Sequence, residues 1–344
     1  MKGKKDKISR RKFIKLVGGG AAGLTAASCI PHVGGNWDTC EVEDPGEIPA
    51  PRSNRVVEVY SEGSVVELDG VIVGEVVTRM FAAGLLVLTD AATLQEAWQA
   101  VLPGRQAGES IALKVNTLGQ ECPTSPELCA AIVDSLHADL QVDSADIFVW
   151  DRTVRELERA KLDELSVAIR GTTYSATDDS GPGYEEEPAC LTGRKIYFSR
   201  ILTQETDHLI NVAVMKNHFA AKFTGCMKNH YGSFSRPFDF HEGSDDHIAN
   251  LNVMPEITGV SRLFVVDALF GVSVGDTDKP PDCAPKRILL SFDPVAIDQR
   301  ALEIRDEMRR IYHGQGPGEQ PGYIQKAADM GLGSIEYDLV TLEI

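Results

Sequence analysis

The segment His208-Leu209-Ile210-Asn211-Val212-Ala213-Val214-Met215 is a short, mostly apolar run that contains several β-branched residues. Such a run predicts a strand buried on both faces, as in the parallel sheets of α/β proteins. The polar triplet Lys216-Asn217-His218 follows it directly. In open α/β sheets, ligands bind beyond the carboxyl ends of the strands. The segment therefore predicts a fold class and also the place of a functional site.

Strand and helix signals alternate on both sides of this segment. Apolar runs predict further strands at 56–60, 111–115, 146–150, 263–267, 287–292 and 337–344. Helical spacing predicts helices at 73–87, 91–102, 124–140, 153–165 and 295–312. This alternation predicts an α/β domain over residues 55–344, with a mostly parallel sheet and helices on both faces. An acidic stretch with Gly and Pro at 171–190 predicts a solvated loop, the boundary of a smaller inserted subdomain.

The composition is that of a globular protein. Of 344 residues, 43% are hydrophobic and 25% are charged, which is enough for a large core. With 34 basic and 51 acidic residues the formal net charge is −17. A chain this acidic is a poor candidate for binding nucleic acid or an anionic membrane through its overall field. Aromatic residues, at 7%, are too sparse for a surface that stacks single-stranded nucleic acid.

Residues 1–28 differ from the rest, with eight basic residues and one acidic residue. Arg10-Arg11 with Phe13, followed by a short apolar stretch of small residues, resembles a twin-arginine signal. The stretch is shorter than the about 20 residues that span a membrane. We expect export by the twin-arginine machinery to the periplasm or outer cell surface; the alternative is a basic tail on a cytoplasmic protein. Without these residues the net charge falls from −17 to −24.

The end of this signal allows two interpretations. Ala26-Ala27-Ser28 fits cleavage after small residues. Cys29 follows directly and resembles the lipid-modified cysteine of bacterial lipoproteins, which would be the protein's one contact with a membrane. Residues 29–54 then predict a flexible tether. Because the twin-arginine machinery carries folded proteins, the resemblance also implies a bound cofactor or metal of unspecified kind.

The seven cysteines form no C-x-x-C motif. The sequence thus lacks the usual signature of a zinc ribbon, a thioredoxin-type site, c-type haem attachment or an iron–sulfur cluster. In an exported protein, spaced cysteines predict disulfides. Six remain if Cys29 is lipidated. Cys122 and Cys129, which flank a short Pro-containing segment, are the pair we predict, and the pairing of the others stays open.

The densest polar cluster lies between residues 215 and 247. The triplet Lys216-Asn217-His218 is repeated as Lys228-Asn229-His230, and Lys114 and Asn116 occupy an earlier strand end. Ammonium groups and amides are common donors to a bound anion. We therefore predict that Lys114, Lys216 and Lys228 hold a carboxylate or phosphate of a small molecule. Asn116 and Asn229 are predicted to orient it.

The two histidines of the triplets suggest a catalytic step. Histidine titrates near neutral pH, so His218 and His230 are predicted to move a proton, with Lys216 as a further catalytic residue. The alternative is that the lysines are solvated strand-end residues and that the histidines make structural hydrogen bonds. The repeated triplet and its place at a strand end favour the functional interpretation.

A metal site is the second hypothesis for this cluster. Four histidines, with neighbouring aspartates, supply the ligand types of zinc, iron or another divalent metal: His218, His230, His241 and His247. None of them has H-E-x-x-H or H-x-x-x-H spacing.

Asp267, which ends an apolar run, and Asp298 each have two interpretations. Either residue is a ligand-binding carboxylate of the site or an acid that caps a helix or satisfies buried polar groups. The sequence Thr124-Ser125-Pro126-Glu127 separately predicts a capping box at the start of the helix at 124–140.

A serine hydrolase is a minor alternative. Gly271-Val272-Ser273-Val274-Gly275 matches the nucleophile elbow, and Asp293 and His313 follow in the order of α/β-hydrolases. A loop stands where the helix after the serine is required, which weakens this interpretation.

Several of these residues form an ordered set along the chain: Lys114, Asn116, Lys216-Asn217-His218, Lys228-Asn229, Gly232, Asp267 and Asp293-Pro294-Val295-Ala296-Ile297-Asp298. In this order and spacing they resemble the "domain of unknown function 362" family of bacteria and archaea. The resemblance spans roughly residues 55–310 and implies an α/β fold, but no reaction. Some family members carry a ferredoxin-like segment with closely spaced cysteines; this sequence lacks it, so no iron–sulfur role is implied.

Together these features predict an exported enzyme or cofactor-dependent protein that binds a small anionic ligand, by an unspecified reaction. The alternative is a non-catalytic binding protein of the periplasm or cell surface.

Overall fold

The computed structural model describes residues 39–42, 46–67, 70–119, 121–163, 172–178 and 181–344. Residues Thr39–Ile344 form one compact unit. The predicted signal peptide at 1–28, the predicted lipid anchor Cys29 and the first part of the predicted tether lie outside the described residues.

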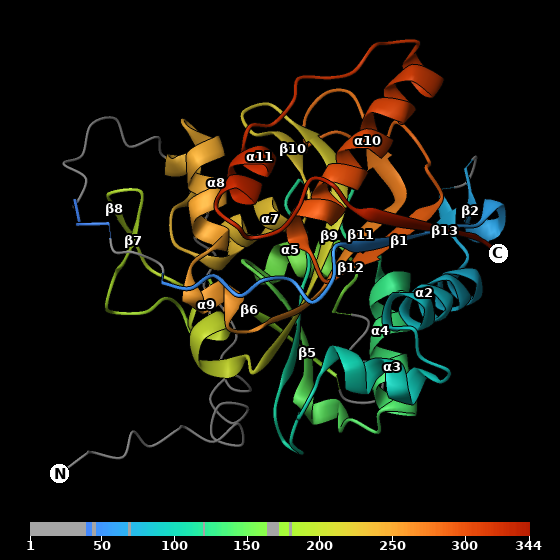
Figure 1. The fold of residues 1–344 in the computed structure, drawn as a ribbon, viewed down its shortest axis with the longest axis horizontal. Coiled ribbons are helices and arrows are strands. Elements are labelled where there is room, and N and C mark those ends of the chain that lie inside the picture. The colour runs from blue at the N-terminus through green and yellow to red at the C-terminus, as the bar shows by residue number, and fades with distance from the viewer. Residues whose placement is uncertain (1–38, 43–45, 68–69, 120, 164–171, 179–180) are drawn as a thin grey trace. The chain divides into compact units, whose positions relative to one another are not determined.

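A mixed sheet forms the centre of this unit and has nine strands among the described residues. The strands are β1 Arg55–Tyr60, β4 Ile111–Lys114, β5 Ile147–Asp151, β6 Thr173–Ala176, β9 His208–His218, β10 Lys222–Thr224, β11 Ser261–Val272, β12 Arg287–Ser291 and β13 Asp338–Glu343. Their order is β13-β1-β12-β11-β9-β4-β5-β6, and β10 pairs with β9 (Figure 1).

The sheet is mostly parallel, as the sequence predicts. The neighbours β11, β9, β4, β5 and β6 all run in one direction, and β13 runs parallel to β1. One central strand differs: β12 is antiparallel to both β1 and β11. The short β10 folds back on β9 as an antiparallel hairpin.

Strand β9 shows why these residues form a buried parallel strand. Its side chains point alternately to the two faces of the sheet. Ile210 and Val212 pack in one hydrophobic core, and Leu209, Ala213 and Met215 pack in the other. Because both faces are covered, the stretch 209–215 of this strand is apolar except for Asn211.

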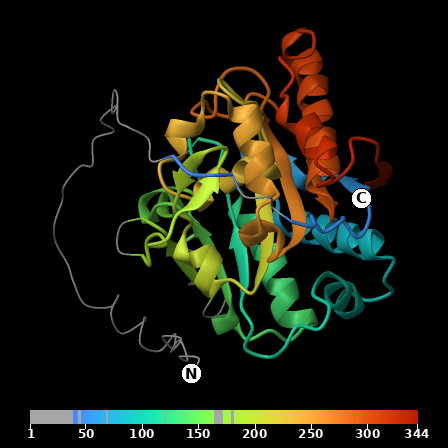
Figure 2. The same ribbon diagram turned by 60° about the vertical axis from the view of Figure 1, so that its left-hand side comes forward.

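Helices cover both faces of the sheet, which confirms the predicted architecture (Figures 1 and 2). The helices of one face are α2 Gly74–Thr89, α3 Leu94–Val101, α4 Pro126–Asp139 and α5 Val154–Arg159. Those of the other face are α7 Cys226–Asn229, α8 Ser244–Asn252, α9 Pro255–Thr258, α10 Pro294–His313 and α11 Tyr323–Asp329. Short 3-10 turns are η1 Glu62–Ser64, η2 Ser144–Asp146, η4 His230–Ser233 and η5 Pro237–Phe240, and η3 Ile201–Glu205 is a π turn.

Local sequence signals set several helix ends. The Asp293 carboxylate accepts hydrogen bonds from the N–H groups of Val295 and Ala296, and Pro294 occupies the first turn of α10. The helix ends at Gly314, whose φ of 62° suits glycine. The capping box predicted at Thr124-Ser125-Pro126-Glu127 does not form, because Ser125 is the N-cap residue and the Thr124 hydroxyl instead donates to the Val212 carbonyl at 2.9 Å.

Two parts of the predicted loop at 171–190 form strands. Thr173–Ala176 forms β6 at the edge of the main sheet. The end of the region belongs to a small hairpin of β7 Ala189–Leu191 and β8 Arg194–Ile196, and a second small hairpin joins β2 Val65–Val66 to β3 Val71–Ile72. The sequence Thr-Tyr-Ser-Ala lacks the apolar run of a central strand because an edge strand has one neighbour and is only partly buried.

The predicted Cys122–Cys129 disulfide is wrong. The structure joins Cys40 to Cys190, with a Cα–Cα distance of 5.8 Å. Cys122 and Cys129 are buried thiols that pack in different hydrophobic clusters. The observed disulfide attaches the predicted tether to β7, so this part of it is not a free linker.

Within the described part of the chain, no single helix is long and apolar enough to cross a membrane. Helices α2 and α3 meet at a bend of 61°. They reach the length and apolar composition of a membrane span only when the two are taken together.

Candidate functional site

Three adjacent strands bring polar residues to one edge of the sheet. β4 ends at Lys114, which pairs with Trp150 of β5, so Asp151 lies just beyond it. On the other side Lys114 pairs with Asn211 of β9, and β9 continues past β4 to Lys216 and His218. The helical turns α7 and η4 supply the remaining groups. The space above β4 is thereby enclosed as a small cavity.

This cavity has a volume of about 60 Å³, room for a few water molecules or one small oxyanion. Its lining consists of Lys114, Asn116, Leu118, Asp151, Arg152, Glu156, Lys216, His218, Thr224, Lys228, Asn229, Tyr231, Gly232, Pro237, His241 and Thr277. The structure thus brings all three predicted lysines together with both predicted asparagines.

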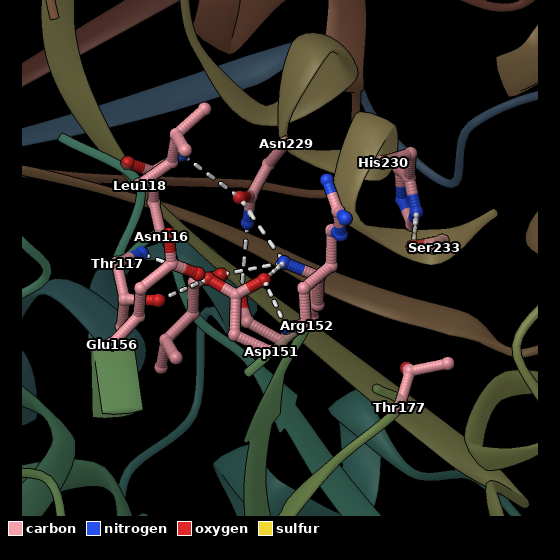
Figure 3. A network of polar contacts seen from close by, with 12 residues as sticks. Asn116, Thr117, Leu118, Asp151, Arg152, Glu156, Thr177, Asn229, His230 and Ser233 are labelled. Atoms are coloured by element: carbon pink, nitrogen blue, oxygen red, sulfur yellow. Dashed lines mark hydrogen bonds and ion pairs between the residues drawn. The ribbon is translucent and has the colours of Figure 1, made fainter. Parts of the chain in front are cut away.

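Lys114 is neutralised by Asp151. Its Nζ lies 2.8 Å from Asp151 Oδ1 and also donates to the Val115 carbonyl at 2.7 Å. The other carboxylate oxygen, Oδ2, accepts from the N–H (2.8 Å) and the hydroxyl (2.7 Å) of Thr117 (Figure 3). Burial lowers the pKa of Lys114, and the charge of Asp151 opposes that change. Removing one partner of such a buried pair costs about 3–5 kcal/mol.

Lys216 and Lys228 differ from Lys114, since no carboxylate of the described residues lies within ion-pair distance of either Nζ. Lys216 donates to the Leu118 carbonyl at 2.9 Å. Lys228 Nζ lies 4.1 Å from the centre of the Tyr231 ring, a cation–π contact. Burial, followed by repulsion from Lys216, lowers the pKa of Lys228 to about 7. Burial also lowers the pKa of Lys216.

A fourth cation of the lining, Arg152, is already paired. Its guanidinium lies 3.0 Å from Asp178 Oδ2. The uncompensated cationic groups of the described lining are therefore Lys216 and Lys228.

His218 lines the cavity and has a neutral ring. Its Nδ1 accepts from the N–H groups of Ala220 at 3.0 Å and Ala221 at 3.2 Å. The proton of the neutral ring must then sit on Nε2. Burial, then the charge of Lys228, lowers the pKa of His218 to about 2. This environment does not suit the predicted acid–base role near neutral pH.

His230 does not line the cavity, contrary to its predicted role. Its Nε2 lies 3.1 Å from Asn211 Nδ2 and its Nδ1 lies 3.2 Å from Ser233 Oγ. Figure 3 shows the contact with Ser233, apart from the contacts of Asp151. Burial lowers the pKa of His230 to about 3. The residue is a structural part of a buried amide network.

That network continues from Asn211 to the cavity wall. Asn229 Nδ2 donates to Asn211 Oδ1 at 2.9 Å and to the Lys114 carbonyl at 3.2 Å. Asn229 Oδ1 in turn accepts from Asn116 Nδ2 at 3.2 Å. Asn116 and Asn229 therefore hold fixed orientations in the cavity wall.

The four histidines predicted as metal ligands do not converge. His241 stacks on His218 with ring centres 5.2 Å apart, and His247 bonds to Thr192 Oγ1 at 2.6 Å. Among the described residues, no group of three or more His, Cys, Asp or Glu side chains is placed to hold a metal ion. The chain separates these side chains because His230 points into the amide network and His247 lies on α8.

Asp267 is a structural acid and does not line this cavity. Its Oδ2 accepts from the N–H (2.8 Å) and hydroxyl (2.6 Å) of Ser125. Its Oδ1 accepts from the Leu269 N–H at 3.1 Å. Asp267 therefore fixes the start of α4, which corrects its predicted role in ligand binding at this site and leaves the core-satisfying interpretation.

The residues of the hydrolase alternative are also apart. Asp293 caps α10, and His313 Nε2 lies 3.1 Å from Asp282 Oδ2. Ser273 immediately follows β11 and its N–H donates to Asp282 Oδ1. No hydrogen bond among the described residues joins Ser273, Asp293 and His313, so the predicted triad is not assembled.

Two acids shape the site, of which sequence reasoning missed Asp151 and left the role of Asp298 open. Asp151 could have been found, because it directly follows the predicted apolar strand at 146–150 beside the one that ends at Lys114. Asp298 of α10 had been left undecided between a site carboxylate and a structural acid. It accepts from the N–H groups of Cys226 at 2.6 Å and Met227 at 3.0 Å, and so fixes the turn that carries Lys228. Burial raises the pKa of Asp298 to about 7.

Gly232 gives a test of the Lys114–Asp151 pair. A Cβ atom at this position would lie 2.7 Å from both Lys114 Nζ and Asp151 Oδ1. We expect Gly232→Ala to displace the pair and lower the free energy of unfolding by about 1–3 kcal/mol, measured by urea denaturation. Gly316→Ala is the control, since its Cβ would meet nothing within 4 Å. Equal stabilities of the two variants would contradict this packing.

Comparisons with known proteins place the chain in a family. A crystal structure of a protein from Thermotoga maritima is similar at 10% identity with a TM-score of 0.42, covering 69% of this chain and 60% of that one. This chain thus spans about 60% of the length of that protein. Curated proteins gave no match. The family model described as "Domain of unknown function (DUF362)" matches residues 111–303, more than half of the chain. The chain therefore belongs to the domain of unknown function 362 family.

Proposed function

We propose that the cavity binds the anionic group, a carboxylate or a phosphate, of a small ligand. One observation carries this proposal: the buried amino groups of Lys216 and Lys228 line one cavity without a carboxylate partner among the described residues. Burying a charge without a counter-charge is unfavourable for folding. Such an arrangement is retained when the missing charge arrives with a ligand.

The neighbouring groups fit this role. His218 presents Nε2–H as a neutral donor, since its Nδ1 accepts two backbone hydrogen bonds. Lys114 is occupied by Asp151 and so contributes less net charge. The anion would thus be held by Lys216, Lys228 and His218 in a site that excludes bulk water, where each interaction is stronger than at the surface.

The same cavity also supplies a group for chemistry at neutral pH. Lys228, with a pKa of about 7, can exist as an amine or as an ammonium ion there. Neither His218 nor His230 has this property, because burial keeps both neutral. Binding of the anion is therefore the function we propose, and Lys228 is the candidate for any proton transfer that follows it.

We further propose that the protein is exported by the twin-arginine machinery. The Cys40–Cys190 disulfide supports an oxidising compartment, because such bonds rarely persist in the cytoplasm. The paired residues Arg10 and Arg11 support the route.

Replacing Lys228 by methionine tests the anion proposal. Methionine is unbranched like lysine, one atom shorter and uncharged. We therefore expect Lys228→Met to bind sulfate at least tenfold more weakly, while its free energy of unfolding rises by about 1–3 kcal/mol. Isothermal titration and thermal unfolding measure the two effects. The exposed Lys326, which pairs with Asp246, gives the control Lys326→Met.

The stability gain should depend on pH in a defined direction. The Lys228 pKa is lowered from 10.5 to about 7, so the unfolded chain binds more protons than the folded one between these values. The destabilisation of the folded state by the buried charge of Lys228 is fully present below pH 7 and is lost as the pH rises toward 10.5. A Lys228→Met variant that is less stable than the wild type at pH 6 would indicate a structural lysine and refute the proposal.

Anion binding should itself depend on pH. Sulfate keeps its charge between pH 6 and 9, and its binding favours the ammonium form of Lys228. We therefore expect the affinity of the wild type for sulfate to fall as the pH rises above 7, by up to about tenfold per pH unit. Calorimetry in two buffers with different ionisation enthalpies should show proton uptake on binding at pH 8. A flat profile in the wild type would exclude Lys228 as the titrating partner.

Export can be tested in the native host. Changing Arg10→Lys and Arg11→Lys keeps the charge but breaks the paired arginines, so we expect the protein to stay in the cytoplasm with Cys40 and Cys190 as free thiols. Cell fractionation and alkylation with mass spectrometry report the two outcomes. Lys4→Arg with Lys5→Arg is the charge-matched control. Undiminished export of the Arg10→Lys, Arg11→Lys protein would rule out this route.

A further inference from the structure

One wall of the cavity carries an acceptor that the described residues leave without a partner. Asn116 is 8% exposed and lines the cavity. Its Nδ2 donates to Asn229, but its Oδ1 makes no hydrogen bond with the described residues. A buried acceptor in this state costs about 1–3 kcal/mol unless something donates to it.

The orientation of the Asn116 amide is fixed by backbone atoms. The Lys114 carbonyl can only accept, so the atom of Asn229 beside it must be Nδ2. The other amide atom of Asn229 is then Oδ1, and it must face Nδ2 of Asn116. Asn211 follows the same logic, because its Nδ2 donates to the Cys226 carbonyl at 2.9 Å. Turning Asn116 over would place two oxygens together.

A second orphaned group lies in the same lining. Thr224 of β10 is 3% exposed, and its Oγ1 has no hydrogen-bond partner among the described residues. Thr224 pairs with Lys216 across the hairpin of β9 and β10. The cavity thus combines two uncompensated ammonium groups with an unused acceptor and an unused hydroxyl.

We propose that the ligand is a hydroxy acid, an anion whose neutral hydroxyl donates to Asn116 Oδ1 while Lys216 and Lys228 hold its charge. This inference rests on the proposed function. It specifies a neutral donor, because a ligand ammonium group would be repelled by the two unpaired lysines. Thr224 Oγ1 can accept from the same hydroxyl or donate to the anionic group.

This arrangement makes the site selective. A plain carboxylate would leave Asn116 Oδ1 buried and unpaired, whereas the hydroxy acid satisfies it. Sites built around a ligand hydroxyl discriminate strongly against the analogue that lacks it, since their own polar groups are left without partners. We expect at least about a tenfold difference in affinity between matched pairs.

The test compares glycolate with acetate, and lactate with propionate, in NMR titrations of the full chain. The wild type should prefer the hydroxy acid of each pair about tenfold or more. Asn116→Ala removes the acceptor of the ligand hydroxyl, and Thr224→Val replaces the threonine hydroxyl by a methyl group. Each variant should bring the affinity ratio of each pair toward one. Thr341→Val on the edge strand β13 controls for the substitution itself. Thermal unfolding checks that every variant is folded.

The outcomes separate this inference from the anion proposal. Equal binding of glycolate and acetate by the wild type, with sulfate binding still lost in Lys228→Met, overturns the hydroxy acid and leaves the anion site standing. An affinity ratio that is unchanged in both Asn116→Ala and Thr224→Val also overturns it. If sulfate, acetate and glycolate all fail to bind, both proposals are wrong.

Discussion

The site depends on the difference in length between two adjacent strands. β4 ends at Lys114, whereas β9, in register with it at Asn211, continues for seven more residues to His218. The overhang leaves a space above β4 that the hairpin strand β10 and the turns α7 and η4 close. A backbone that turns back over a sheet edge must satisfy its polar groups there, because water is excluded. The asparagines and the buried acids do this, and they enclose the cavity as they do so.

Three buried acids near this edge already bind groups of the protein itself. Asp151 neutralises Lys114 and binds Thr117, Asp267 fixes the start of α4, and Asp298 fixes the turn before Lys228. The carboxylates therefore hold the scaffold and leave Lys216 and Lys228 uncompensated. An acidic protein can thus have a small cavity lined by lysines, because its carboxylates bind other groups of the protein or are screened by solvent at the surface.

The sequence predicts the strands and long helices because apolar runs and helical spacing are local signals. It also predicts that Lys114, Asn116 and Lys216 lie together, since strand ends meet at one edge of the sheet. It fails for His230 because the second triplet lies on helical turns, where successive side chains diverge by about 100°. Lys228 and Asn229 reach the lining while His230 does not. The disulfide is missed because sequence spacing does not show which cysteines lie next to each other in the fold.

The hydrogen-bond directions at the site follow from a few backbone groups, so the site is fixed before any ligand arrives. The carbonyls of Lys114 and Cys226 set the amides of Asn229 and Asn211, and two backbone N–H groups set the tautomer of His218. Side chains held in this way need no reorganisation on binding, which lowers the entropic cost of complex formation. Of the groups proposed to hold the anion, Lys228 has a pKa of about 7 and so can change its charge state near neutral pH. A ligand anion would therefore favour the protonated form of this amine in a site whose hydrogen-bond directions are already set.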